Sequence, residues 1–479
     1  MFRSLFCLSL LLCFSVPLFA SESLTLNTDE VVRLVLEKNF AIKRTELQTK
    51  IAEENLRETK SLFDTNLSAE AFHNVDTSAR ASTFFGDRTD TTAWDVSLTR
   101  KIPTGTTTEL SFTNQRQKTF GAAAIGGVPI ISTTPLYEPT LSFSVTQSLV
   151  QNALGLDDRR QVEMAKRAYE SADFHTKHAV QQVIFRSLVN FWNLFFAQQH
   201  YDALAESVKA SSSFFSTTRE KRKLGTAQST DVLSSEAIFL RREGELLSAE
   251  RERARFEEAL RADLEIGPDV VLHLQDGPQK LLPPDKEFND LLKDAFEHRN
   301  DYLAARKDLE HSEVKLKMEN LSRWPRLDLT GTLALNEIDP SYSSAVQSMD
   351  HTNWTVGVSL QLPLENRAAR AGARRAKAEV ARALFAMKDL ELGIENGVTR
   401  AYKDVSSHQE VVMKLTRAQE LERAKLRAEF HKYTQGRSSA EMIIRFQDDL
   451  LEAERRAIEA RRRYIESVYT LQLAEGTFP

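Results

Sequence analysis

Residues 156–224 read LDDRRQVEMAKRAYESADFHTKHAVQQVIFRSLVNFWNLFFAQQHYDALAESVKASSSFFSTTREKRKL and contain neither glycine nor proline. Because these two residues are the strongest helix breakers, the stretch predicts one uninterrupted helix, about 100 Å long at roughly 1.5 Å per residue. Gly225 ends this helix, and a second one is expected over 226–266, before the helix stop Gly267-Pro268. The segment therefore predicts a long helical hairpin with its tip near Gly225.

The same pattern recurs near the end of the chain. A helix is expected over 373–435, Gly436 interrupts it, and another helix is expected over 437–475. Apolar and small residues recur at heptad spacing in these arms, which is typical of coiled-coil seams. Small residues let helices approach closely, so the seams favour packing among many helices, although a solitary coiled coil has the same pattern.

Other segments alternate between apolar and polar residues, as strands do. The apolar positions are Leu141, Phe143 and Val145; Leu327, Leu329, Leu333 and Leu335; and Trp354, Val356, Val358, Leu360 and Leu362. Each segment has about the length of a tilted membrane-crossing strand, with one apolar and one polar face. A half-buried strand of a soluble sheet has the same period. Beyond residue 20 no run of 18 apolar residues occurs, so any membrane crossing would have to use strands closed into a barrel.

The order of these elements repeats along the chain. Residues 31–72 align with residues 291–332 at a constant offset of 260, and Gly225 matches Gly436 at an offset of 211. We therefore predict a first repeat at 21–266, a linker at 267–288 and a second repeat at 289–479. Each repeat has the order helix, strand, strand, long helical hairpin.

The first repeat carries an insertion at 73–139 that holds many of the chain's glycines and prolines. Two strands are expected in it, joined by a turn at Pro103-Thr104-Gly105, which predicts a β-hairpin. Their alternating apolar residues are Trp94, Val96 and Leu98, then Leu110 and Phe112. This hairpin lies either in an exposed surface loop or in the sheet as two further strands, and the sequence leaves both possibilities open.

Composition limits the cellular setting. The formal charge is −5 and both signs are interspersed, so no nucleic-acid-binding surface is expected. Residues 1–20 combine Arg3 with an apolar run too short to span a bilayer, which predicts a secretory signal peptide. The only cysteines, Cys7 and Cys13, lie inside it, so the mature chain has no disulfide and no thiol chemistry.

Motifs of enzymatic chemistry are missing from the sequence: it has no GxSxG, HExxH, Walker loop or GxGxxG. The histidines are scattered, and the pair His175 and His178 has no third ligand of a convincing kind nearby. We therefore expect no enzyme, no catalytic residue, no metal site and no cofactor.

With a signal peptide, two tandem halves and glycine-marked hairpin tips, the mature chain resembles the TolC-type outer-membrane efflux proteins over nearly its whole length. The most specific segments are the tips KLGTAQSTDVL at 223–233 and YTQGRS at 433–438. The strand-to-helix passages LVQN at 149–152 and PLEN at 363–366 are also typical.

The resemblance implies an α+β membrane protein that forms a homotrimer. Each chain would supply four strands to one β-barrel in outer-membrane lipid and its helices to a coiled-coil periplasmic tunnel. The expected function is a passive exit duct for efflux or type I secretion. Its partners would be a periplasmic adaptor (membrane fusion) protein and an inner-membrane transporter of the RND, ABC or MFS type.

The resemblance also implies roles for residues at the tips. Gate links at the periplasmic entrance would involve Asp231 and Tyr433, with Arg437 one residue before the position, Ser438, where the family has its arginine. The residues that would line the constriction are Met442 and Arg445, where the family has acidic rings. Three copies of Arg445 would favour anions; alternatively, Arg445 lies on an outer face and pairs with Asp449. Adaptor docking is expected at Leu224, Gly225, Thr226, Gln435, Gly436 and Arg437.

A secreted coiled-coil structural protein without a pore is the competing hypothesis, because long helices with heptad seams suffice for it. Outer-membrane location and channel activity distinguish the two hypotheses.

Overall fold

The computed structural model describes residues 23–81, 86–121, 124–125, 128–129, 134–275 and 286–478. The predicted signal peptide at 1–20 lies outside these residues. In the described part of the chain, no helix has a stretch that is both long and apolar enough to cross a membrane.

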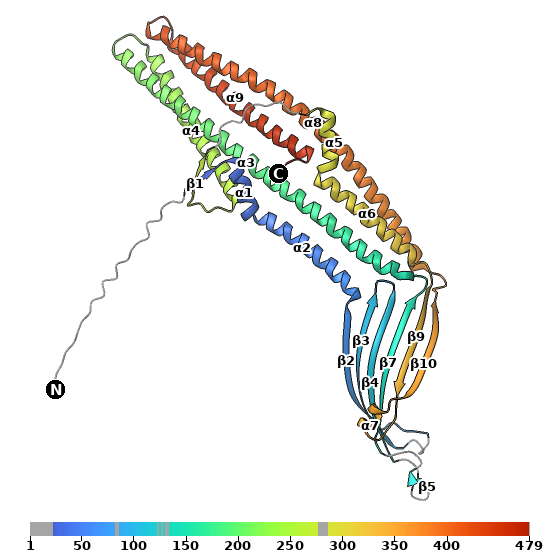
Figure 1. Ribbon diagram of the computed structural model, residues 1–479. Coiled ribbons are helices and arrows are strands. Elements are labelled where there is room, and N and C mark those ends of the chain that lie inside the picture. Colours follow the sequence, from blue (N-terminus) through green and yellow to red (C-terminus); the bar gives the residue numbers. More distant parts are fainter. Residues whose placement is uncertain are drawn as a thin grey trace, which may run out of the picture. The chain divides into compact units, whose positions relative to one another are not determined.

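The first half of the chain contains the helices, the strands and one long helical hairpin in the expected order (Figure 1). Its elements are β1 (Ser23–Leu26), α1 (Thr28–Lys38), α2 (Phe40–Lys60), η1 (Ser61–Phe63), β2 (Thr65–Asp76), β3 (Arg88–Ile102), β4 (Thr106–Phe120), β5 (Ala124–Ile125), β6 (Val128–Pro129), β7 (Leu136–Ser148), η3 (Ala153–Gly155), α3 (Leu156–Lys223) and α4 (Ser229–Leu264).

The second half repeats this order without the inserted strands. Its elements are β8 (Val271–Leu274), α5 (Phe288–His298), α6 (Asn300–Leu321), β9 (Arg326–Asn336), α7 (Tyr342–Gln347), β10 (His351–Gln361), α8 (Arg367–Thr434) and α9 (Ala440–Glu475). The helices α3 and α8 both have 68 residues, and α4 and α9 both have 36. The two halves therefore repeat the same order of elements, and the arms of their long hairpins have matching lengths.

The described chain divides into two compact units, and each unit contains segments of both halves. The first unit contains the part up to Arg44, Ala179–Ala295 and Asn396–Pro479; the second contains Thr45–His178 and Phe296–Glu395. The repeat boundaries at 266 and 289 remain a division based on sequence.

The helix α8 begins at Arg367, six residues before the start predicted at 373. Gly372 lies inside the helix, and a Cβ there would come within 2.4 Å of a Glu319 carboxylate oxygen of α6. This glycine serves close packing of two helices instead of ending one, which is why the start predicted from the sequence was wrong.

The predicted linker at 267–288 also differs from a simple loop. Its described residues include β8, which pairs in parallel with β1, so that Ser23 lies opposite Val271 and Leu26 opposite Leu274. The start of the first repeat is thereby paired, within the first unit, with the segment that follows this repeat.

Six strands form one antiparallel sheet in the second unit, in the order β10-β9-β7-β4-β3-β2 (Figure 1). The three segments predicted to be strands are β7, β9 and β10, so these predictions are confirmed. The hairpin β3–β4 lies between β2 and β7, so it adds two strands to the sheet and is not an exposed surface loop. The resemblance implies four strands per chain, and this number is wrong here, because the sheet has six. The segment inserted between β2 and β7 spans 77–135, since β2 extends to Asp76 and β7 starts at Leu136.

The pairing register is continuous through the inserted strands, so that rows of similar side chains cross the sheet on each face. The serine row is Ser68, Ser97, Ser111 and Ser142, which lie directly opposite one another on β2, β3, β4 and β7. The apolar row, one position away and on the other face, is Leu67, Leu98, Leu110, Phe143, Leu333 and Trp354. A slip of one residue in any strand would move its polar residues to the apolar face, so the register is strongly specified.

Engineered disulfides test this strand order, because the mature chain has no cysteine of its own. The double variants S68C/S97C and S111C/S142C should each form a disulfide on mild oxidation, since directly opposed residues have Cβ atoms about 5 Å apart. A gel shift without reductant, followed by mass spectrometry, detects it. The matched control S68C/S142C should stay reduced; a disulfide there would mean that β2 pairs with β7 and that the hairpin lies outside the sheet.

Candidate functional site

The two hairpin tips belong to the first unit and have the same backbone geometry. At the first tip, the Thr226 N–H donates to the carbonyl of Lys221 at 2.9 Å and the Gly225 N–H to that of Arg222 at 3.0 Å. At the second tip, the Arg437 N–H donates to the carbonyl of Lys432 at 2.9 Å and the Gly436 N–H to that of Tyr433 at 3.1 Å. This pattern is the Schellman motif, which needs a left-handed residue after the last helical turn. Gly225 and Gly436 supply it with φ values of 74° and 72°.

All six residues expected to dock the adaptor are exposed at these tips: Leu224, Gly225, Thr226, Gln435, Gly436 and Arg437. Leu224 is 77% exposed. Neither glycine has an atom within 4 Å of the place where a Cβ would stand. The glycines are therefore required by the turn and leave both tips open to a partner.

Asp231 caps the helix that follows the first tip. Its carboxylate accepts a hydrogen bond from the Gln228 N–H at 3.0 Å, and the two residues form a reciprocal capping box at the start of α4. At the second tip Ser439 has the same task and accepts from the Met442 N–H at 3.3 Å. Helix capping is compatible with the gate role expected of Asp231, which stays a prediction.

Tyr433 is 6% exposed and lies in a small apolar cluster with Phe214, Ala440 and Ile443. The rings of Tyr433 and Phe214 are 5.4 Å apart between centroids, and the Lys221 ammonium lies 3.8 Å from the centre of the Tyr433 ring. Since Phe214 and Lys221 belong to α3, Tyr433 joins the first hairpin to the second by packing and a cation–π contact.

The three expected gate residues are not linked within one chain. Among the residues that the structure describes, no hydrogen bond or ion pair joins the side chains of Asp231, Tyr433 and Arg437. Arg437 is exposed. A link that involves it stays a prediction for the assembled protein.

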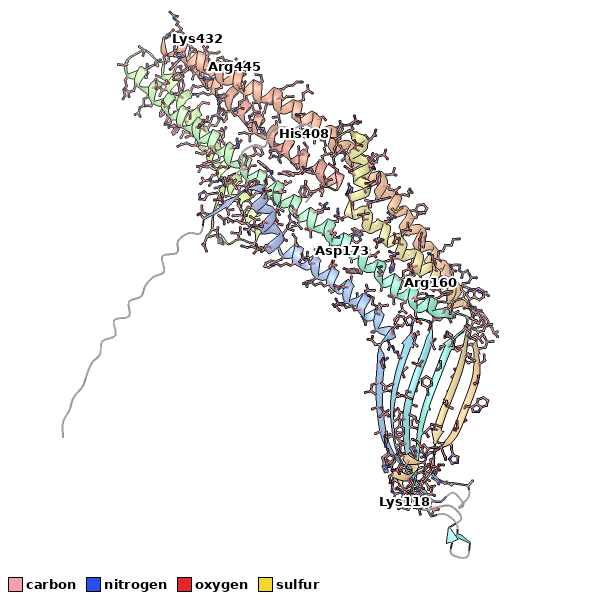
Figure 2. All side chains as sticks on the ribbon, viewed as in Figure 1. Lys118, Arg160, Asp173, His408, Lys432 and Arg445 are labelled. Atoms are coloured by element: carbon pink, nitrogen blue, oxygen red, sulfur yellow. The ribbon has the colours of Figure 1, made fainter. Side chains whose placement is uncertain are left out.

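Met442 is half-buried on α9, and Arg445 is exposed near the tip of the second hairpin (Figure 2). Asp449, the alternative partner of Arg445, is bound instead by Lys425 of α8, with 2.8 Å between Nζ and the carboxylate. Within the described residues Arg445 forms no ion pair.

Sequence reasoning missed an ionic contact between the two hairpins, which we call the Asp448 clamp: Asp448 of α9 with Arg241 and Arg242 of α4. Arg241 Nη2 donates to both carboxylate oxygens of Asp448 at 2.8 Å, and Arg242 donates to the same carboxylate. The Arg242 side chain is only 5% exposed, so its charge depends on Asp448 and Glu245. The available signal was the position of these residues: Arg241 and Arg242 lie 16 and 17 positions beyond Gly225, and Asp448 lies 12 beyond Gly436.

The Asp448 clamp lies beside a polar cleft between α3, α4 and α9. His200 lines this cleft, and burial lowers the pKa of its imidazole. Across the cleft, hydrogen bonds from Arg455 and Arg456 lower the pKa of Glu452 to about 2. The cleft thus contains several charged groups paired across or along the helices, an arrangement that holds these helices in register.

In the second unit, one group of side chains has the composition of a metal site. Glu337, Asp350 and His351 lie close together at the end of β9 and β10, with 2.9 Å between His351 Nδ1 and Glu337. Asp350 and His351 are exposed, and exposed carboxylates gather in this way without a metal. We assign no function to this group.

Comparisons with solved structures identify the fold. The chain is similar to VceC from Vibrio cholerae, an outer membrane protein, with a TM-score of 0.68 and 14% identity over 94% of this chain and 96% of that one. It is similar to the Neisseria gonorrhoeae MtrE outer membrane channel in its open state, with a TM-score of 0.67 and 16% identity over 94% and 88%. The chain has the fold of the TolC-type outer-membrane channels.

A third TolC-type structure, the Campylobacter jejuni CmeC outer membrane channel, matches with a TM-score of 0.67 and 13% identity over 94% of this chain and 85% of that one. No protein-family model matches the chain, and no curated protein sequence does. The likeness therefore lies in the arrangement of elements, and within the TolC-type fold the tips described above are the ends of the two long hairpins.

Removing the charge of Asp448 should loosen the tips. Asp448→Asn leaves the nearly buried Arg242 with Glu245 alone, so α4 should separate from α9 more readily. We expect the free energy of this local opening to fall by about 1.4 kcal/mol. Amide hydrogen exchange near the tips should then be about tenfold faster. The matched control is Asp449→Asn, because Asp449 pairs with Lys425 inside the second hairpin and both groups are partly exposed. Equal exchange rates in the two variants would contradict a clamp between the hairpins.

Proposed function

We propose that the chain is one subunit of a homotrimeric channel-tunnel in the outer membrane, with a helical extension in the periplasm. The duct is passive: an inner-membrane transporter delivers cargo through a periplasmic adaptor. The likeness to three solved outer-membrane channels over 94% of the chain supports this function. The tandem helical hairpins with matching tips support it independently.

One observation supports closure by further copies of the chain: among the strands that the structure describes, the edge strands β2 and β10 of the sheet each pair with one neighbour only. Both edge strands are exposed along almost their whole length, including apolar side chains such as Trp354 at 72% and Leu67 at 68%. An unpaired edge presents free backbone N–H and C=O groups, which no membrane can satisfy. Copies related by a cyclic axis would pair β2 of one chain with β10 of the next and leave no edge.

The adaptor would dock on the two tips, where Leu224 and its neighbours are exposed. The transporter, of the RND, ABC or MFS type, would supply the energy. Opening of the periplasmic end would follow partner binding as a shift in population, with the Asp448 clamp among the contacts that hold the closed form.

Fractionation and conductance test the proposal together. The mature protein should be found in outer membranes as a trimer that dissociates on heating, and the purified trimer should form channels in planar bilayers. A soluble product without channel activity would favour the competing hypothesis, a secreted coiled-coil protein, and overturn ours.

Arg445 should set the ion preference of the constriction. Three unpaired guanidinium groups around one passage attract anions, so Arg445→Asp should shift the reversal potential in a salt gradient toward cation preference. The matched control is Arg456→Asp on the same helix, because Arg456 is already paired with Glu452 at 2.7 Å. Unchanged selectivity in Arg445→Asp would show that this side chain does not face the passage.

A further inference from the structure

The hairpin β3–β4 is an integral part of the sheet. Its two strands have 15 residues each and pair with each other and with their neighbours over most of that length. Every pair of neighbouring strands in the sheet is antiparallel. Because the hairpin adds two strands, strand direction still alternates from β2 to β10. The edges β2 and β10 therefore have the directions that an antiparallel contact between copies requires.

The polar face is bonded across the inserted strands. The hydroxyls of Ser68 and Ser97 are 2.7 Å apart, which joins β2 to β3, and those of Ser111 and Ser142 are 2.7 Å apart, which joins β4 to β7. On the other face the apolar row crosses all six strands, and its members are between 42% and 72% exposed. Such a row, exposed on a single sheet, is a surface that lipid would cover.

The turn of the hairpin is fastened to the passage between β7 and α3. A Cβ on Gly105 would lie 2.6 Å from the Asn152 carbonyl oxygen, and one on Gly155 would lie 2.0 Å from that of Pro103. Both glycines have positive φ values, 75° and 69°. Next to this contact, Lys101 Nζ binds the buried carboxylate of Asp158 at 2.6 Å. A surface loop would have no need of such fitted backbone contacts.

From the shared register and the fastened turn, we propose that three copies close a barrel of eighteen strands, six from each chain. The inference rests on the proposed trimeric channel. Barrel diameter grows roughly in proportion to strand number, so the lumen would be about one and a half times as wide as that of twelve strands. Its wall would be the polar face with the serine row. Such an exit does not select small solutes by size, which leaves the choice of cargo to the transporter.

Polymer labelling measures the lumen without relying on channel activity. Ser359 of β10 lies on the polar face, six positions from Asn353, which continues the serine row on this strand. In trimers held in vesicles, Ser359→Cys should react with maleimide-polyethylene glycol up to a size limit set by the lumen. Val358→Cys, one residue away on the apolar face, is the matched control and should react with none of the polymers.

Removing the hairpin should narrow the lumen. In Ser359→Cys protein with residues 77–135 replaced by an Asn-Gly turn, the largest polymer radius that reacts should fall to about two-thirds. A control that lacks only residues 122–133 keeps all six strands and should retain the original limit. An unchanged limit in the variant without the hairpin would overturn the wide barrel.

Electron cryomicroscopy of the full-chain trimer gives a second answer that does not depend on whether the shortened variant folds. Eighteen strands in one barrel would support the inference. A trimeric channel with twelve strands, and the hairpin outside the wall, would overturn it while leaving the proposed function intact. Absence of a trimer would overturn both.

Discussion

Backbone hydrogen bonding at the two edges of the sheet is the constraint on which this structure depends. Among the described strands of this sheet, β9, β7, β4 and β3 have a neighbour on both sides, whereas β2 and β10 each have one. Each edge leaves a row of unpaired donors and acceptors beside exposed apolar side chains, such as Val356 at 65% and Val358 at 66%. In water this arrangement invites aggregation, and in lipid each unsatisfied group costs several kcal/mol. Pairing of the two edges in the proposed assembly would remove this cost.

The long helices follow the same logic. The helix α3 buries most of its large apolar side chains within the chain, whereas several on α8 remain exposed, as Phe385 does at 73%. Contacts between the two hairpins near the tips include the ring of Tyr433 against Phe214, the Lys221 ammonium over the Tyr433 ring and the Asp448 clamp. Local contacts of this kind can be exchanged for others at modest cost, which would suit the opening proposed for the periplasmic end.

Much of the fold could be predicted from the sequence because glycine and proline are so unevenly distributed. The two tips, the strands β7, β9 and β10 and the order of elements follow from helix breakers and from period-two alternation. The strand order could not be predicted, since a period of two tells which residues share a face but not which strands are neighbours. The serine row becomes visible only when Ser68, Ser97, Ser111 and Ser142, up to 74 residues apart, are brought into register.

The site was predicted less completely, for a related reason. Exposure of the tip residues followed from their turn chemistry, which is local in sequence. The Asp448 clamp was missed because it joins residues 206 and 207 positions apart on two different helices. Gly372 misled the prediction of where α8 starts, since the sequence does not distinguish a glycine that ends a helix from one that admits Glu319 of α6.

Photo-crosslinking from the edge strand tests most directly whether each sheet is completed by another copy. A photoreactive phenylalanine analogue in place of Trp354 on β10 is exposed along the free edge, and crosslinked peptides can be identified by mass spectrometry. Pairing of the edges between copies predicts covalent dimers and trimers whose crosslinks join β10 of one chain to β2, residues 65–76, of another. Crosslinks confined to one chain, or between two copies of β10, would contradict it.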